Sequence, residues 1–351
     1  ISRKLDAESQ SDHGGTGLMF RRAARLFIFS TLVSAVGACA APARNGVLIS
    51  RDECRPEVLR MPTVVGTTVR GELSGFDPCH ASVTLTLPEG VEKPPLVISV
   101  HGGGGRADAQ AITDEFAANG MATLIFDAYK HNGVPPFTDN TYRQMMLYKV
   151  AQQAYEWAIR RQDIDVHRIY FYGISNGASV VLNLAAVVNP EHIKGVFAEA
   201  PTPIGIGYPW TIQVPVTIAF GQEDDLGARI GQKRWMISAP CRLSIQYPEA
   251  PRGTAEKCSS SAPTGQMMTT LEWANEVEVR PDVKMEIKYF EGVAHGAFLG
   301  PLTVQTQQQF YATIRQIGRP DIGWSEGATP EGRKRLLNEA LLFFSKSSNQ
   351  R

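Results

Sequence analysis

The chain has 351 residues, of which 43% are hydrophobic and 20% charged, an ordinary balance for a globular protein with a sizeable core. Its formal net charge is zero, and its basic residues are scattered rather than striped, which argues against a nucleic-acid partner. No internal repeat is visible, so a single α/β domain of roughly 250–300 residues with insertions accounts for the length.

The N-terminal segment carries an export signal rather than part of the fold. Residues 1–18 are polar and Gly-rich and precede Met19, so we interpret them as upstream translated or disordered sequence. Residues 19–40 combine a basic start, an apolar run and small residues around Cys39. This pattern is typical of a secretory signal and is too short for a membrane-spanning helix. We therefore expect the folded domain to comprise residues 41–351.

Two cleavage routes are open for this signal. The residues before Cys39 resemble a bacterial lipobox, which would leave a lipidated Cys39 at the mature N-terminus. Cleavage by signal peptidase I after Ala40 would instead release a soluble protein. We favour a lipoprotein, periplasmic or in the outer membrane, over a secreted form.

The remaining cysteines fit an exported protein, because an oxidising compartment favours disulfides. They are Cys54, Cys79, Cys241 and Cys258, which allow three pairings. We expect Cys54–Cys79 and Cys241–Cys258, since each pair closes a short polar loop; buried free thiols are the alternative. The sequence contains neither C-x-x-C nor H-E-x-x-H, so we expect no metal site.

The first strand that bears on function is residues 95–100, a continuous apolar run typical of a parallel strand covered on both faces. It leads directly into His101 and the glycines at 102–105, here called the glycine loop. Such a loop lets backbone N–H groups approach the oxyanion of acyl transfer where side chains would collide. A phosphate-binding loop is the alternative, but the Lys-Ser/Thr that would follow is missing. We interpret His101 as a structural residue.

A strand at 121–126 and a helix at 141–160 come next. Residues 168–172 then predict a short strand rich in β-branched and aromatic residues, and residues 178–188 a mostly buried helix. Between them lies the G-x-S-x-G sequence of residues 173–177, here called the elbow. Its glycines would tolerate the crowded backbone of a sharp strand-to-helix turn that presents Ser175 as a nucleophile. An ordinary Gly-rich turn is the alternative.

Two further strands, 194–200 and 214–220, lead to an acidic segment that contains Asp224 and Asp225. A carboxylate just past a strand end can hold a histidine in the useful tautomer and stabilise its imidazolium form. We favour Asp224 for this role, with Asp225 as the second choice and an acidic surface loop as the alternative. Residues 227–281 are longer than the connection needs, and we predict a cap near the active-site mouth, with surface decoration as the alternative.

The last strand, residues 283–290, alternates apolar and polar residues and leads into a Gly-flanked loop with His295. A general base must come from such a position to reach the serine. A final helix begins at Thr329 and Pro330. Strands that alternate with helices indicate a mostly parallel sheet with helices on both faces, and ligands bind such sheets at the carboxyl ends of the strands.

The chain order Ser175, Asp224, His295 is that of the α/β-hydrolase arrangement. From about residue 85 to 344 the sequence resembles the dienelactone hydrolase-like branch of that superfamily. The resemblance rests on the strand and glycine loop at 95–105, residues 126–129, the elbow, Gly221-x-x-Asp224 and Gly292-x-x-His295. It implies hydrolysis of a carboxylic ester or lactone without a metal or organic cofactor. The founding dienelactone hydrolases carry cysteine as nucleophile, so Ser175 favours a general serine esterase or a relative of prolyl-oligopeptidase-type peptidases.

The expected mechanism follows from these residues. His295 takes the proton of Ser175 as the hydroxyl attacks the carbonyl, and Asp224 orients His295. The backbone N–H groups of Asn176 and of Gly102 or Gly103 would hold the oxyanion.

A small-molecule or polymeric ester would be the binding partner. It could contact the aromatic residues Tyr129, Trp210 and Trp235, for which core or rim packing is the alternative. Two other functions stay open. One is a serine peptidase, although neither a Glu-Glu pair nor a propeller domain is visible, and the other is a non-catalytic cell-envelope protein with the hydrolase fold.

Overall fold

The computed structural model describes residue 54 and residues 58–60, 72–134, 140–202, 205–226, 236–238, 267–305 and 324–347. Several predictions from the sequence lie outside this part of the chain. They concern the lead at 1–18, the signal at 19–40 with its lipobox at Cys39, the Cys241–Cys258 pair and Trp235.

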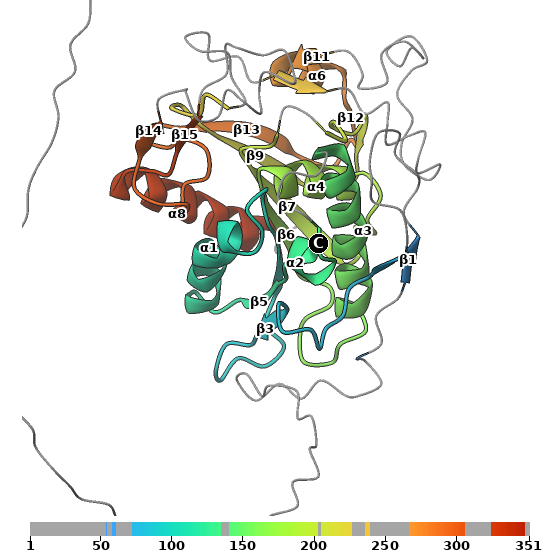
Figure 1. Ribbon diagram of the computed structural model, residues 1–351. Helices are drawn as coiled ribbons and strands as arrows, with labels where there is room; N and C mark the ends of the chain where they lie inside the picture. Colours follow the sequence, from blue (N-terminus) through green and yellow to red (C-terminus); the bar gives the residue numbers. More distant parts are fainter. Residues whose placement is uncertain are drawn as a thin grey trace, which may run out of the picture. The chain divides into compact units, whose positions relative to one another are not determined.

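A seven-stranded sheet forms the centre of the described part (Figure 1). Its strands lie in the order β13 (Met285–Phe290), β9 (Val216–Gly221), β7 (Ile193–Glu199), β6 (Ile169–Ile174), β4 (Leu96–Val100), β5 (Ala122–Ile125) and β3 (Thr84–Thr86). Only β3 is antiparallel to its neighbour within this sheet. Every residue of β4, β6 and β9 is buried, which explains why these strands are continuous apolar runs.

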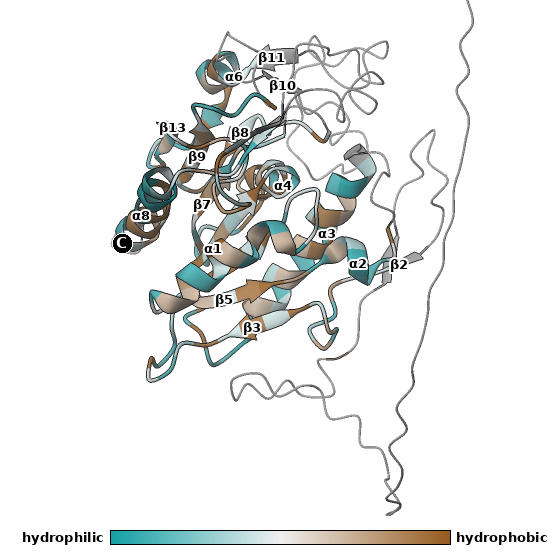
Figure 2. Ribbon diagram, turned by 60° about the vertical axis from the view of Figure 1, so that its left-hand side comes forward, coloured by the Kyte–Doolittle hydropathy of each residue, from teal (hydrophilic) through white to brown (hydrophobic). Residues whose placement is uncertain are grey.

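Helices cover both faces of the sheet (Figure 1). On one face, α1 (Ala107–Ala118) and α8 (Pro330–Ser347) share an apolar cluster that includes Phe116 and Phe344. On the other face lie α2 (Ala128–His131), α3 (Asn140–Ala158) and α4 (Asn176–Leu184). Figure 2 shows hydrophilic residues on α1 and α8 and hydrophobic residues along β5. The expected α/β-hydrolase architecture is confirmed, with a mostly parallel sheet between two layers of helices.

Smaller elements complete the described part. Four two-stranded sheets pair β1 (Val58–Arg60) with β2 (Glu72–Ser74), β8 (Thr211–Ile212) with β12 (Glu278–Val279), β10 (Met236–Ser238) with β11 (Met267–Thr269), and β14 (Thr303–Gln305) with β15 (Trp324–Glu326). The remaining helix is α6 (Thr270–Glu276). Among the residues placed by the structure, no helix is both long enough and apolar enough to cross a bilayer.

Part of the predicted cap, residues 227–281, is integral to the domain body. Trp273 of α6 is completely buried, and its Nε1 donates a hydrogen bond to the carbonyl oxygen of Pro209 at 2.7 Å. The strand β12 that follows pairs with β8. Residues 227–235 and 239–266 lie outside the described residues, so a cap at the active-site mouth stays a prediction.

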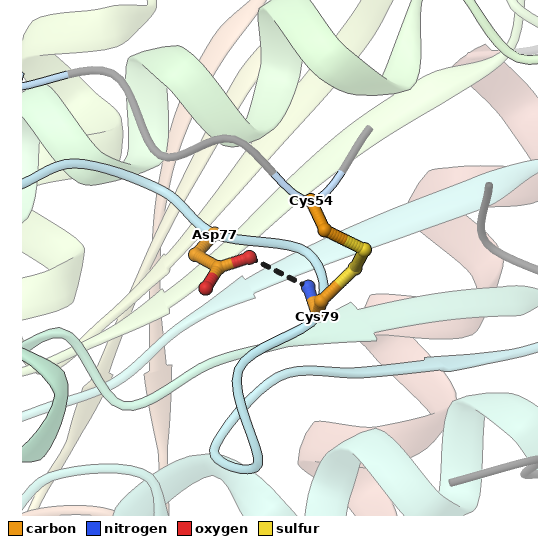
Figure 3. The surroundings of a disulfide bond; sticks show 3 residues. All are labelled: Cys54, Asp77 and Cys79. Atoms are coloured by element: carbon orange, nitrogen blue, oxygen red, sulfur yellow. Dashed lines mark hydrogen bonds between the residues drawn. A yellow bond between two sulfur atoms is a disulfide. The ribbon is translucent and has the colours of Figure 1, made fainter. Parts of the chain in front are cut away.

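The disulfide Cys54–Cys79 is present, as predicted (Figure 3). It joins residues 25 positions apart, with a Cα–Cα distance of 5.2 Å. The backbone nitrogen of Cys79 also donates to Oδ1 of Asp77 at 2.9 Å. The bond thus fastens Cys54 to the loop that precedes β3.

Candidate active site

Ser175 occupies the strained turn that a serine nucleophile requires. It lies between β6 and α4 with φ of 55° and ψ of −117°, a conformation that costs a residue with a β-carbon about 1–3 kcal/mol. A β-carbon on Gly173 would lie 2.4 Å from the carbonyl oxygen of Gly177, and one on Gly177 would lie 2.1 Å from that of Val100. The flanking glycines therefore permit close backbone packing, while Ser175 itself takes the positive φ. Its half-buried side chain lies at the positive N-terminal end of α4.

His295 and Asp224 form a buried pair. Nδ1 of His295 lies 3.2 Å from Oδ2 of Asp224, and the two residues are only 2% and 3% exposed. Burial lowers the pKa of His295 by desolvation. The charge and hydrogen bond of Asp224 raise that pKa, as do the charges of Glu199 and Asp108, and the net pKa lies above the ordinary histidine value. Such a pair can accept a proton and stabilise the resulting imidazolium.

The acidic segment Glu223–Asp225 holds the histidine loop, residues 291–299, in more than one place. Glu223 accepts hydrogen bonds from the backbone nitrogens of Gly292 and Val293, at 3.1 and 3.0 Å. The second choice for the acid, Asp225, instead accepts from the backbone nitrogen of Ser325 at 2.7 Å. The carbonyl oxygen of Ser325 accepts from the nitrogen of His295. Asp224 contacts the imidazole, and its two neighbours support the backbone around it.

The elbow and the histidine loop lie side by side. A β-carbon on Gly296 would lie 2.8 Å from Cδ1 of Ile174, the residue before the predicted nucleophile. Glu199 contacts both segments, since its carbonyl oxygen accepts from the nitrogen of Ser175 and its carboxylate from the nitrogen of Ala297. The structure thus places the predicted nucleophile and the predicted base on adjoining segments of chain.

The glycine loop also packs against the elbow. A β-carbon on Gly102 would lie 3.2 Å from Cβ of Ser175. The N–H of Gly104 donates to Oδ2 of Asp108 at 2.7 Å, and the carbonyl oxygen of Gly103 accepts from Nη2 of Arg143. These contacts fix the loop at Gly103 and Gly104. The predicted oxyanion donors, the N–H groups of Gly102 and Gly103, come immediately before the N–H that Asp108 occupies.

His101 has a structural role in this loop, as expected. Its Nε2 accepts a hydrogen bond from the backbone nitrogen of Ala128 at 3.0 Å, so Nδ1 donates to the carbonyl oxygen of Gly102 at 2.8 Å. Complete burial lowers the pKa of His101, which keeps the ring in this neutral tautomer.

A buried polar network fixes Asn176, which is the predicted oxyanion donor from the elbow. Its Oδ1 accepts from Nε2 of Gln144 at 3.0 Å and from Oγ1 of Thr202 at 2.9 Å, and its Nδ2 donates to the hydroxyl of Tyr129 at 3.4 Å. Because hydrogen bonds hold both the amide oxygen and the amide nitrogen of this side chain, the backbone N–H of Asn176 has a fixed direction.

Tyr129 is buried next to the elbow and the glycine loop. Its ring meets that of His101 edge-on at 4.6 Å, and Cζ of Arg143 lies 4.2 Å from its centroid. Burial raises the pKa of Tyr129 to about 12, so it remains a neutral phenol at physiological pH. Tyr129 and Trp210 both belong to the main apolar core, which is the packing alternative for each of them.

Comparison with known proteins gives limited matches. No family model matches the chain. The quorum-quenching protein AidA of Acinetobacter baumannii is 27% identical over 155 residues, which span 41% of this chain and 48% of that protein. The chain thus spans about half the length of the curated relative it matches.

Solved structures that resemble the chain include a dienelactone hydrolase, an esterase and a phosphotriesterase. A dienelactone hydrolase from Anabaena variabilis is 13% identical, covers 83% of this chain and 98% of its own, and has a TM-score of 0.42. Thermogutta terrifontis esterase 2 is 13% identical, covers 83% and 94%, and scores 0.43. The dienelactone hydrolase-like promiscuous phosphotriesterase P91 from metagenomic libraries is 14% identical, covers 75% and 91%, and scores 0.42. Likenesses at this level do not establish a shared activity.

Proposed function

We propose that this chain, whose fold is that of the α/β-hydrolases, is a serine hydrolase of the dienelactone hydrolase-like group that cleaves carboxylic esters. One observation carries the proposal: Ser175, in a strained strand-to-helix turn, adjoins the loop that holds the buried His295–Asp224 pair. An ordinary Gly-rich turn needs neither a positive φ at a serine nor a buried ion-pair partner for a neighbouring histidine.

In the proposed reaction, Ser175 Oγ attacks the ester carbonyl carbon while Nε2 of His295 removes the hydroxyl proton. The tetrahedral intermediate places its negative oxygen toward the backbone N–H groups of Asn176 and of Gly102 or Gly103. Collapse expels the alcohol, which takes the proton from His295. Water, deprotonated by His295, then hydrolyses the acyl-enzyme and restores Ser175.

The proposed substrate is an ester, whose leaving group is an alcohol. The residues around Ser175 determine which esters are bound. Arg143 lies over the ring of Tyr129 and donates to the carbonyl oxygen of Gly103 in the glycine loop, and we propose that Tyr129 contacts the ester. A related protein is described as quorum-quenching, so a signal molecule with an ester or lactone bond is a reasonable member of the test panel. Peptidase activity and a purely binding role are the rival proposals.

We also propose that the protein is exported, as a lipoprotein through Cys39 or as a secreted form. The Cys54–Cys79 disulfide supports an oxidising compartment. Mass spectrometry of the mature N-terminus would distinguish a diacylated Cys39 from cleavage after Ala40, and an uncleaved N-terminus would contradict export through this signal.

A Ser175→Ala variant tests the proposed activity. Turnover of short p-nitrophenyl esters should fall by about 10³-fold or more, and labelling by a fluorophosphonate probe should disappear. Ser345→Ala on α8 is the matched control, because this serine is exposed and its hydroxyl donates to the Leu342 carbonyl oxygen of its own helix. If the wild-type protein neither labels nor hydrolyses any ester, the binding role is favoured. If it cleaves only peptides, the peptidase is favoured.

A further inference from the structure

Glu199, at the end of β7, connects the two segments that carry the predicted nucleophile and base. Its carboxylate accepts a hydrogen bond at Oε1 from the backbone nitrogen of Ala297, at 2.6 Å, and one at Oε2 from the hydroxyl of Tyr172, at 2.5 Å. Its own carbonyl oxygen accepts from the nitrogen of Ser175 at 2.9 Å. Ala297 is two residues beyond His295, so Glu199 contacts both the segment of the predicted nucleophile and the segment of the predicted base.

The position of Glu199 is rigid. Within the sheet it pairs with Ile174 of β6 on one side and Ala219 of β9 on the other. The next residue, Ala200, has a φ of 47°, which is rare for a residue with a β-carbon. Ala200 is held in that conformation by a hydrogen bond to the carbonyl oxygen of Ala219. The carboxylate is therefore directed toward the histidine loop by a fixed backbone.

The stability of the fold does not by itself explain why residue 199 is a glutamate. Glu199 is 1% exposed, and its two hydrogen-bond donors, a phenol and an amide, are both neutral. Burial of a carboxylate without a cationic partner is unfavourable, and an apolar residue of similar volume would be better tolerated in a core. Burial accordingly raises the pKa of Glu199, against the hydrogen bonds that lower it.

We propose that Glu199 is a positioning residue of the active site. Its carboxylate holds Ala297, and with it His295, beside the strand that carries Ser175. Its negative charge favours the imidazolium that His295 becomes when it takes the serine proton. The inference rests on the proposed function for its catalytic meaning, whereas the effect on the histidine is a property of the folded protein.

Several charged groups face the histidine loop and must be considered together. Asp224 and Asp108 act on His295 in the same direction as Glu199, and Asp224 acts more strongly. On the α8 side, Nε of Arg333 donates to the carbonyl oxygen of Ala297 at 3.0 Å, and it remains in every variant below. Removal of the Glu199 charge should therefore lower the pKa of His295 without abolishing the contribution of Asp224.

Three variants separate the effect of the Glu199 charge from the effect of its hydrogen bond with Ala297. Glu199→Gln keeps the shape: its amide oxygen can accept from Ala297, its amide nitrogen can donate to the Tyr172 oxygen, and the charge is lost. Glu199→Ala removes both the charge and the hydrogen bond with Ala297. Tyr172→Phe is the matched control, because it removes the other hydrogen bond and leaves the carboxylate on Ala297.

The kinetic results should differ accordingly. In Glu199→Gln the acid limb of kcat/KM should move to lower pH, while kcat at high pH stays within about threefold of wild type. In Glu199→Ala, kcat should fall by about tenfold or more with KM changed less than about twofold, because the base is misplaced while substrate binding is retained. Tyr172→Phe should keep kcat close to wild type, because the carboxylate still accepts the hydrogen bond of Ala297.

A direct titration of the His295 imidazole by ¹⁵N NMR, in wild-type protein and in Glu199→Gln, provides a readout that does not depend on activity. An unchanged titration of His295 would overturn the inference, and so would full kcat in Glu199→Ala. If Glu199→Ala does not fold, Glu199→Gln and the NMR titration decide the question. If the titration moves but ester hydrolysis survives in Ser175→Ala, the proposed function is wrong and the coupling of Glu199 to His295 stands.

Discussion

Oδ2 of Asp224 lies 3.2 Å from Nδ1 of His295, and both side chains are almost fully shielded from solvent. A carboxylate at this position requires the proton of a neutral imidazole to be on Nδ1, which leaves the Nε2 lone pair to act as base. The neighbouring Asp225 has its own partner, Ser325, so the two aspartates have different roles and can be distinguished by substitution.

Asp224→Asn should lower kcat by about 10³- to 10⁴-fold with little change in KM, because the amide permits the wrong tautomer. Asp225→Asn is the matched control. It should retain most of kcat and lose thermal stability, since it weakens the support of Ser325. Steady-state kinetics and thermal melts of both variants check this. A larger loss of kcat in Asp225→Asn than in Asp224→Asn would reverse the assignment.

The pH dependence of ester hydrolysis follows from the pKa of His295. The base must be neutral to accept the serine proton, and the carboxylates around it raise its pKa in spite of burial. The kcat/KM of the free enzyme should therefore fall as pH decreases, with an apparent pKa above the ordinary histidine value of about 6.5. A pH profile in buffers of constant ionic strength measures this. An acid limb below the ordinary value would show that another group titrates or that burial dominates.

Backbone contact at the elbow makes Gly177 intolerant of any side chain. A β-carbon there would lie 2.1 Å from the carbonyl oxygen of Val100, and backbone cannot move as a flexible side chain can. Gly177→Ala should therefore lower the free energy of unfolding by about 3 kcal/mol or more, or prevent folding.

Gly300→Ala is a suitable control for that variant, because a β-carbon there would meet no atom within 4 Å. Chemical denaturation of the two variants gives the comparison. Equal stability of Gly177→Ala and Gly300→Ala would mean that β4 and the elbow are less closely packed than the structure indicates.

The parts of the site that could be predicted from sequence are those set by local pattern. The apolar runs of β4, β6 and β9 are local features, and so are the elbow glycines and the loop positions of Asp224 and His295. Glu199 and Glu223 could not be assigned in this way. Their partners lie 98 and about 70 positions further along the chain, and only the sheet order brings them together. The run of acids at 223–225 was a visible signal, but its division into three contacts depends on where the histidine loop lies.

The network behind Asn176 escaped prediction for the same reason. Gln144 is in the second turn of α3, where the helical periodicity gives no sign of a polar contact. It is nevertheless completely buried, with Nε2 on Asn176 and Oε1 accepting from the nitrogen of Ile206. Gln144→Leu should leave the backbone nitrogen of Ile206 without this acceptor and Asn176 with one hydrogen bond fewer, which destabilises the fold by about 1–3 kcal/mol. It should also lower kcat, because Asn176 is held by fewer hydrogen bonds. Gln152→Leu on the same helix, at a partly exposed position, should change neither.

The Cys54–Cys79 bond provides a prediction that concerns stability alone. It closes a loop of 25 positions, and loss of a link of that length destabilises a folded chain by about 3 kcal/mol. Cys54→Ala with Cys79→Ala should therefore lower the melting temperature, while kcat at 25 °C stays near wild type, because the bond lies before the edge strand β3 and two strands separate β3 from β6 in the sheet. Reduction of the wild-type protein should lower the melting temperature at least as much. A loss of kcat without a loss of stability would mean that the loop before β3 takes part in substrate binding.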